Sequence, residues 1–335
     1  MKRRLVNSTL ALLLIAAASL PAFGQNVNWK GNEYPEYMNV FNEKDEAKKA
    51  AAAEKWLADH KDADPIAVTQ IYQFMLFGYA KSSNWPKTLE SLEKMDVATK
   101  LTDADKKQYT QIGLLAASNA KNTPKTIEYA EKILKDDPKN LNALISLSGV
   151  LSGSVPASGP SKDAHIERTL KITKEALALP KPQEISAAQW NPIQLQLRET
   201  SCLMLLNQQK HAEAIAECQE ALKLNPKDAF AYYWIGLAHR AALIDLSKKY
   251  NESVDNYNAK RDQGQLVVDE LRAIMQGAEK VASDKRDETV DAFAKAAAIG
   301  GEAGKQAMTE LQKIYTGTPD ELKALIDERK RQLGE

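Results

Sequence analysis

Histidine and cysteine are the side chains of this chain best suited to metal binding or nucleophilic chemistry. The four histidines, His60, His165, His211 and His239, are far apart, and no Asp, Glu or Cys accompanies them at the spacing of a metal site. The sequence contains no G-x-S-x-G turn, no glycine-rich phosphate loop and no H-E-x-x-H motif. We therefore expect no catalytic centre, no metal and no cofactor.

The N-terminus has the pattern of a secretory signal peptide. Three basic residues, Lys2, Arg3 and Arg4, precede an apolar stretch over residues 10–20, and Ala22 and Gly24 are small residues suited to a cleavage site. We predict a signal peptide at 1–24 and cleavage before Gln25, which makes the mature protein exported, in a periplasm or outside the cell. The alternative is an uncut anchor, but the apolar stretch is shorter than the roughly 20 residues that span a membrane.

Charge and composition favour a helical protein that does not bind nucleic acid. Removing residues 1–24 takes away three bases and no acid, so 42 Lys and Arg remain against 45 Asp and Glu, a formal charge of −3. Acids and bases are interspersed, which is typical of solvated helix faces, and no basic cluster suited to nucleic acid is present. No later segment is apolar enough to span a membrane, so we expect no membrane span in the mature chain.

A pattern of about 34 residues recurs along the chain, and it is clearest around residues 195–240. Its second half is carried by Ala214, Cys218, Ala221 and Pro226, and its first half recurs at Tyr232, Ile235, Gly236 and His239. Weaker copies have Tyr72, Met75, Leu76 and Tyr79, then Thr126, Ala130, Ile133 and Pro138. This pattern resembles the tetratricopeptide repeat (TPR), and five to six units cover most of residues 35–335.

The resemblance to TPR proteins implies an all-α fold. We expect a TPR-like α-solenoid, a right-handed superhelix of antiparallel helix pairs, as one repeat domain over residues 25–335. Small residues such as Gly236, Ala214 and Ala221 lie where paired helices come closest. Proline ends a helix at Pro226.

Several segments depart from the repeat. Residues 152–162 and 179–184 are rich in Ser, Gly or Pro and predict breaks between helices. Residues from about 241 to 286 form a helical insertion, and 319–333 predict a polar capping helix. At the start of that helix Thr318 and Glu321 fit a capping box, and Thr123 precedes a proline as a further capping hydroxyl.

The repeat pattern also relates the two cysteines to each other. Cys202 and Cys218 occupy the glycine and phenylalanine positions of one TPR-like unit, and these positions face each other in an antiparallel helix pair. The two side chains are therefore a possible disulfide in an oxidising compartment. The alternative is a pair of packed thiols, which are small and apolar enough for a core.

The resemblance implies that the first helix of each unit lines a concave wall that binds a protein or peptide. The expected wall residues are aromatic, amide and a few other side chains: Gln70, Gln73, Phe74, Phe77, Gln108, Gln111, Asn142, Gln196, Asn207, Phe230, Tyr233, Trp234, Leu237 and Arg240. Amide side chains both donate to and accept from a peptide backbone. The alternatives are a merely soluble wall for the amides, and cover by the inserted helices for the aromatic residues.

The sequence thus predicts an exported scaffold that binds proteins or peptides rather than an enzyme. This prediction extends the TPR resemblance to function, which fold alone does not establish. A structural adaptor for cell-envelope assembly is an alternative. An enzyme or a carbohydrate-binding component is a further alternative, for which the sequence supplies no motif.

Overall fold

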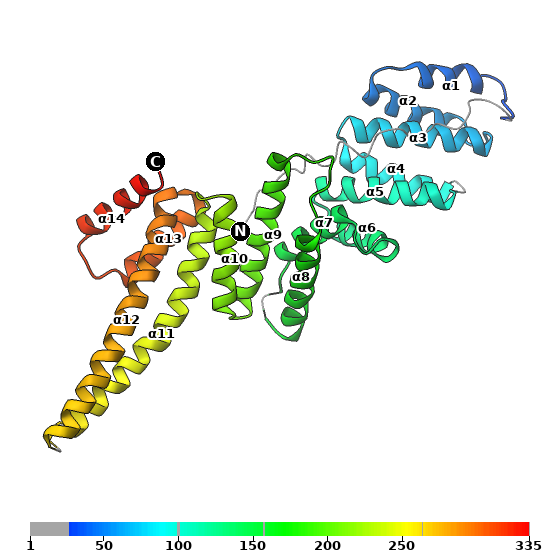
Figure 1. Ribbon diagram of the computed structural model, residues 1–335. Helices are drawn as coiled ribbons and strands as arrows, with labels where there is room; N and C mark the ends of the chain where they lie inside the picture. The colour runs from blue at the N-terminus through cyan, green and yellow to red at the C-terminus, as the bar shows by residue number, and fades with distance from the viewer. Residues whose placement is uncertain (1–26, 99–100, 157, 263, 335) are drawn as a thin grey trace. The chain divides into compact units, whose positions relative to one another are not determined.

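The computed structural model of the protein describes residues 27–98, 101–156, 158–262 and 264–334, and that part of the chain is built from α-helices without strands. The predicted signal peptide lies outside these residues. The helices are, in order, α1 (Glu33–Asn42), α2 (Glu46–Asp59), α3 (Pro65–Lys81), α4 (Trp85–Ala98), α5 (Asp103–Asn119), α6 (Thr123–Asp136), α7 (Leu141–Gly153), α8 (Pro160–Ala178), α9 (Ala187–Asn207), α10 (His211–Leu224), α11 (Ala229–Lys260), α12 (Gln265–Ile299), α13 (Gly301–Ile314) and α14 (Pro319–Gln332). Figure 1 shows them as a succession of helices joined by short turns.

The chain divides into two compact units. Unit 1 ends at Val150 and unit 2 begins at Leu151, so the boundary falls within α7. In unit 1 each helix from α1 to α6 packs on the next, and in unit 2 the helices from α8 to α13 do the same. The segments 152–162 and 179–184 lie around the ends of α8.

Side chains cap most of the helices in the way their sequences indicate. The hydroxyl of Thr318 accepts from the backbone N–H of Glu321, and the Glu321 carboxylate accepts from the N–H of Thr318, which is the predicted capping box. The prediction for Thr123 was wrong. Asn122 takes the capping position of α6, and its side-chain oxygen accepts from the N–H of Lys125.

The same backbone turn joins first to second helix in three repeats. Ser83, Lys121 and Gln209 have φ values of 59°, 56° and 60°, in the left-handed region that non-glycine residues seldom adopt. Each lies in the turn that reverses the chain direction, before α4, α6 and α10 respectively. The repeated residue types are thus accompanied by a turn conformation that repeats in the backbone.

Paired helices come closest at a small residue of the first helix. A Cβ added to Gly113 in α5 would lie 2.6 Å from the Tyr129 ring of α6, and one added to Gly236 in α11 would lie 2.5 Å from the Phe293 ring of α12. Between these two pairs in the chain, Cys202 of α9 and Cys218 of α10 are joined by a disulfide, with their Cα atoms 5.5 Å apart. Both cysteines are fully buried.

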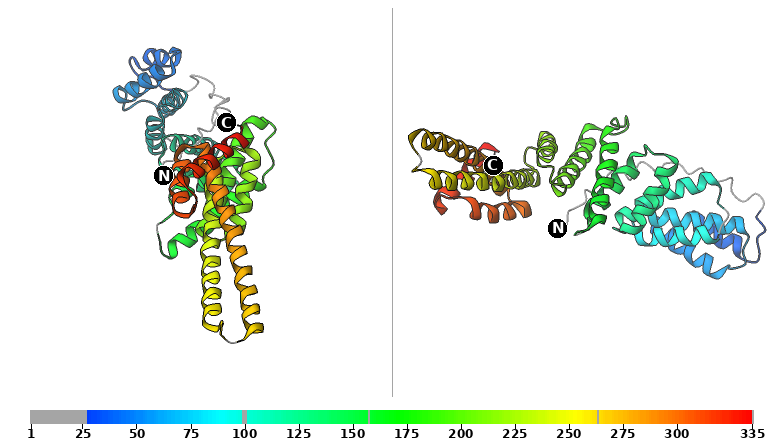
Figure 2. Two further views of the ribbon diagram at one scale, coloured as in Figure 1. Left: turned by 90° about the vertical axis from the view of Figure 1, so that its left-hand side faces the viewer. Right: turned by 90° about the horizontal axis from the view of Figure 1, so that it is seen from below.

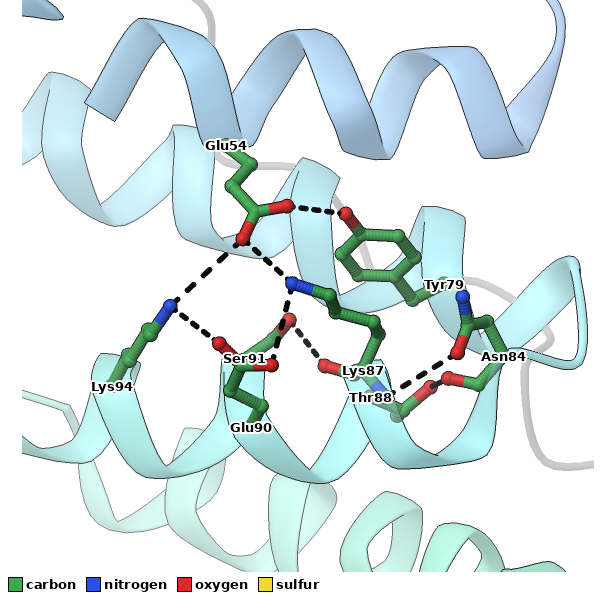
Figure 3. A network of polar contacts seen from close by, with 8 residues as sticks. All are labelled: Glu54, Tyr79, Asn84, Lys87, Thr88, Glu90, Ser91 and Lys94. Atoms are coloured by element: carbon green, nitrogen blue, oxygen red, sulfur yellow. Dashed lines mark hydrogen bonds and ion pairs between the residues drawn. The ribbon is translucent and has the colours of Figure 1, made fainter. Parts of the chain in front are cut away.

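Ion pairs and hydrogen bonds connect helices α2, α3 and α4 of unit 1 (Figure 3). Glu54 of α2 accepts from the hydroxyl of Tyr79 at 2.7 Å and pairs with Lys87 of α4 at 2.9 Å. These bonds lower the pKa of Glu54, and burial together with the Glu54 bond raises the pKa of Tyr79 to about 12. The arrangement recurs one repeat later, where Lys125 of α6 pairs with Glu93 of α4 at 2.9 Å.

The helical insertion lengthens a helix pair rather than adding a separate one. Helices α11 and α12 have 32 and 35 residues and run side by side as a hairpin that extends beyond the neighbouring helices of unit 2 (Figures 1 and 2). We call residues 241–286 the arm. Its tip is the turn between Lys260 and Gln265.

Candidate functional site

The predicted wall residues of unit 1 tie successive first helices together. Tyr37 of α1 donates a hydrogen bond from its hydroxyl to Gln70 Oε1 of α3 at 2.8 Å. One turn further along α3, Gln73 Nε2 donates to the hydroxyl of Tyr109 in α5 at 2.8 Å. Tyr–Gln bonds therefore link α1 to α3 and α3 to α5. Burial raises the pKa of Tyr37 to about 12 and also raises that of Tyr109.

These bonds correct the expectation that the α3 residues form an open wall. Gln70, Gln73 and Phe74 are only 5%, 8% and 5% exposed. The Phe74 ring packs against Tyr37 and Phe41 of α1, with ring centroids 5.8 and 6.0 Å away. Because α1 covers this part of α3, Gln70 and Phe74 are interior contacts and are not available to a partner.

Gln73 differs from its neighbours because one of its two amide atoms lacks a partner. Its Oε1 is buried and has no hydrogen-bond partner in the part of the chain that the structure describes. Buried amide oxygens are almost always paired, since leaving one unpaired costs roughly 1–3 kcal/mol. Phe77 lies one turn further along α3 and is half-buried, with its ring centroid 6.4 Å from that of Tyr109.

The remaining predicted residues of unit 1 are partly accessible. Gln108 and Gln111 are half-buried on α5, and Asn142 is half-buried near the start of α7. Gln108 and Gln111 are three residues apart and therefore neighbours on one helix face. We call Gln73, Phe77, Gln108 and Gln111 the unit 1 wall. Phe77, Gln108 and Gln111 of this wall are half-buried, and Gln73 is buried and bonded to Tyr109.

The predicted wall residues of α11 in unit 2, which we call the α11 stripe, are divided between two hydrophobic clusters. They are Phe230, Tyr233, Trp234, Leu237 and Arg240. Trp234 is 2% exposed and belongs to the same core cluster as the two cysteines, with its ring centroid 5.6 Å from that of Phe230. Trp234 is therefore a core residue, which corrects the expectation that it lines an open wall. Phe230 itself is half-buried at the edge of this cluster.

The other three residues of the stripe pack toward α12 and α13. Tyr233 and Leu237 lie against the cluster around Phe293 and Leu311, and the Tyr233 ring centroid is 5.9 Å from that of Phe293. Arg240 pairs with Glu310 of α13. Burial, followed by the nearby Glu310 carboxylate, raises the pKa of Tyr233. The cover of these residues comes from the part of α12 after residue 286 and from α13.

Two predicted wall residues lie on α9. Gln196 and Asn207 are both half-buried, and Asn207 Nδ2 donates to the backbone oxygen of Leu203 at 2.9 Å. On the same helix, Arg198 pairs with Glu217 of α10 at 2.8 Å. The structure therefore does not gather the predicted residues into one surface, and the unit 1 wall contains most of the predicted glutamines.

The sequence did not reveal the side chains that bond to the predicted wall residues and hold them in the interior. Tyr37 and Tyr109 lie 33 and 36 residues from the glutamines they bond, about one repeat away. That spacing could have identified the two tyrosines as partners of the glutamines. Glu310 lies 70 residues from Arg240 because the arm intervenes, and no spacing rule points to it.

The described residues form no metal-binding cluster. They contain no group of three or more His, Cys, Asp or Glu side chains that could hold a metal ion. His239 lies between Lys285 and Glu288 of α12, and burial followed by the Lys285 charge lowers its pKa. Within the same residues no helix is both long and apolar enough to span a membrane.

Comparison with known families identifies one segment. Residues 203–241 match the family model described as TPR repeat. This segment covers the end of α9, all of α10 and the start of α11, and so includes Cys218 and Gly236. Comparison with curated proteins gives no match.

Solved structures of helical-repeat proteins are similar at low identity. A point mutant of MamA is 18% identical, with a TM-score of 0.38 over 52% of this chain and 87% of that one. The C-terminal part of a TPR repeat-containing protein from Cytophaga hutchinsonii is 12% identical, with a TM-score of 0.40 over 88% of this chain and 97% of that one.

Proposed function

We propose that this tetratricopeptide-repeat protein is an exported scaffold that binds an extended peptide or protein segment at the unit 1 wall. The observation that carries the proposal is the buried and unpaired Oε1 of Gln73. A peptide N–H group is the kind of donor that satisfies such an oxygen, which a ligand reaches once the side chains that bury it move aside. The Nε2 of the same amide is already held by Tyr109, so the side chain is oriented before a ligand arrives.

The neighbouring side chains suit the same kind of ligand. Gln108 and Gln111 are half-buried amides that both donate and accept hydrogen bonds, which matches the alternating groups of a peptide backbone. The half-buried ring of Phe77 offers contact area to an apolar side chain. Recognition through the backbone would make binding tolerant of sequence, with Phe77 supplying a moderate preference for apolar residues.

Export is supported by two independent features. The N-terminal sequence has the basic, apolar and small-residue order of a signal peptide, with Gln25 as the first residue after cleavage. The only two cysteines of the sequence are joined in a buried disulfide, and disulfides persist in oxidising compartments. Mass spectrometry of the protein from the envelope or secreted fraction tests export. A chain that still begins at Met1 would contradict it.

The binding proposal is tested by replacing one amide with a side chain of similar shape. Binding to an array of extended peptides identifies a probe, and fluorescence anisotropy then measures its Kd. Gln73→Met removes the unpaired oxygen, and we expect it to raise the Kd of the probe about tenfold, the effect of losing one hydrogen bond.

Gln70→Met is the matched control because it removes a buried amide from the same helix face. The oxygen of Gln70 already accepts from Tyr37, so this change should lower stability and leave the Kd unchanged. Thermal melting of each variant separates folding from binding. Equal effects of both changes on the Kd, or no binding by the unchanged protein, would remove the unit 1 wall from consideration.

A further inference from the structure

Helix α10 packs on α9, to which the disulfide joins it, without burying a large side chain. Its buried residues are Ala214, Cys218 and Ala221, all of them small. The larger Ile215 and Leu222 of the same helix are only half-buried. Because the burial of apolar area is the main favourable contribution to folding, α10 gains less from packing than a helix with a large buried side chain does.

The second helices of other pairs bury large side chains. Met95 of α4 and Phe293 of α12 are fully buried, and Tyr129 of α6 is 7% exposed. Phe293 lies against Gly236, and Tyr129 lies against Gly113, at the close contact between paired helices. In the pair of α9 and α10 the disulfide takes the place of this ring. A covalent bond therefore stands where these two pairs have apolar packing.

Neither capping nor ion pairing compensates for the small side chains of α10. Lys210 precedes the helix and makes no side-chain capping bond, whereas Asn122 caps α6. Glu217 pairs with Arg198 of α9 at 2.8 Å, but these side chains are 23% and 31% exposed, and ion pairs accessible to water contribute little. A helix of 14 residues is only marginally stable by itself in water. The bond at Cys218, near the middle of α10, is thus its strongest tie to α9.

We propose that the Cys202–Cys218 bond is a redox switch for the packing of α10. With the bond formed, α10 packs against both α9 and α11. With the bond reduced, α10 separates from these helices far more often. Oxidation removes two protons and two electrons from the two thiols, and a disulfide such as oxidised glutathione takes them up and becomes two thiols. The switch does not depend on peptide binding at the unit 1 wall, which involves neither cysteine.

The switch acts on unit 2 and leaves unit 1 packed. The sequence contains only two cysteines, and both belong to unit 2. Met204 of α9 and Trp234 of α11 belong to the same buried cluster as Cys218, so separation of α10 opens this cluster to solvent. Unit 2 is therefore fully packed only under oxidising conditions. While α10 is in place, the buried position of the bond protects it from reductants.

Hydrogen exchange of the full chain, followed by mass spectrometry, tests the switch. One sample is refolded with oxidised glutathione, and the other is refolded and kept in an excess of a phosphine reductant. We expect the amides of α10 to exchange about a hundredfold faster in the reduced sample, the factor that corresponds to a cross-link of this loop length. Exchange in α6 should be unchanged. Equal exchange of α10 in both samples would overturn the proposal, and so would an equal acceleration of α8, α10 and α12.

Two double variants separate the effect of the cross-link from that of the side chains. Cys202→Ala with Cys218→Ala should exchange like the reduced sample whether or not reductant is present. Cys202→Gly with Cys218→Phe recreates the contact of Gly236 with Phe293, and it should slow the exchange of α10 again without any bond. Circular dichroism checks that both variants remain helical. If α10 exchanged as fast in the glycine–phenylalanine variant as in the alanine variant, the bond would not be replacing a missing ring, and the proposal would fail.

Discussion

Gly236 of α11 lies against the ring of Phe293 in α12, so closely that a Cβ on Gly236 would come within 2.5 Å of the ring. One repeat earlier, Cys202 and Cys218 occupy the corresponding positions and are joined by a disulfide. The same point of contact between paired helices is thus filled by a ring against a glycine in one repeat and by a covalent bond in the preceding one. The arm is inserted between Gly236 and Phe293 without disturbing their contact.

Gly236→Ala should destabilise the protein by about 1–3 kcal/mol, because the added methyl overpacks the contact with the Phe293 ring. Urea unfolding followed by circular dichroism measures the change. Gly153→Ala is the control, since a Cβ on Gly153 meets nothing within 4 Å, and its effect should be neutral or slightly stabilising. If Gly236→Ala were as stable as the unchanged protein, the close approach would be wrong.

Replacing both Cys202 and Cys218 with alanine should lower the free energy of unfolding by about 3 kcal/mol, the effect expected for a loop of this length. The bond joins residues 16 apart within one repeat. Unfolding with and without reductant provides the comparison. The unchanged protein should lose stability on reduction, whereas the double variant should not respond. Insensitivity of the unchanged protein to reductant would argue for two free thiols.

Trp234→Ala should lower stability by about 3–5 kcal/mol, as expected for truncating a large core side chain. Trp234 is 2% exposed within the cluster that contains the disulfide. Phe230→Ala, at the half-buried edge of the same cluster, should have a smaller effect. Melting temperature and probe-peptide binding are measured together. A loss of binding without a loss of stability would return Trp234 to the ligand-binding residues.

Stability should fall in alkaline solution as buried tyrosines ionise. Burial raises the pKa of Tyr37 from 10.0 to about 12, so the folded state favours the neutral phenol. This stabilisation is complete below pH 10.0 and is lost as the pH rises through about 12. Urea midpoints across this range, with tyrosinate absorbance, measure the loss. Tyr37→Phe should lower stability by about 1 kcal/mol at neutral pH, since the bond to Gln70 is absent.

Tyr79 and Tyr129 also have pKa values raised to about 12, so the Tyr37→Phe protein should retain part of the alkaline loss and show a shallower fall. An unchanged slope would contradict the assignment of Tyr37 as a contributor. Tyr34 is 48% exposed and, after burial, adds to the raised pKa of Tyr37, so Tyr34→Phe should change the alkaline loss of stability only slightly.

The sequence by itself determined the features that depend on local periodicity. A helical repeat pattern, a glycine where paired helices touch, and cysteines at facing positions follow from residue type and spacing, because the geometry of an antiparallel helix pair is nearly constant. The capping box at Thr318 follows from the same local chemistry.

Only the tertiary structure decided which faces remain open. Helical period places Gln70, Gln73 and Phe74 on one side of α3, but it does not reveal that Tyr37 and Phe41 of α1 cover two of them. The covering residues come from another helix, and the way that helix packs depends on its whole buried surface rather than on any local pattern. For the same reason Trp234 became a core residue, while the amide oxygen of Gln73 was left without a partner in the described chain.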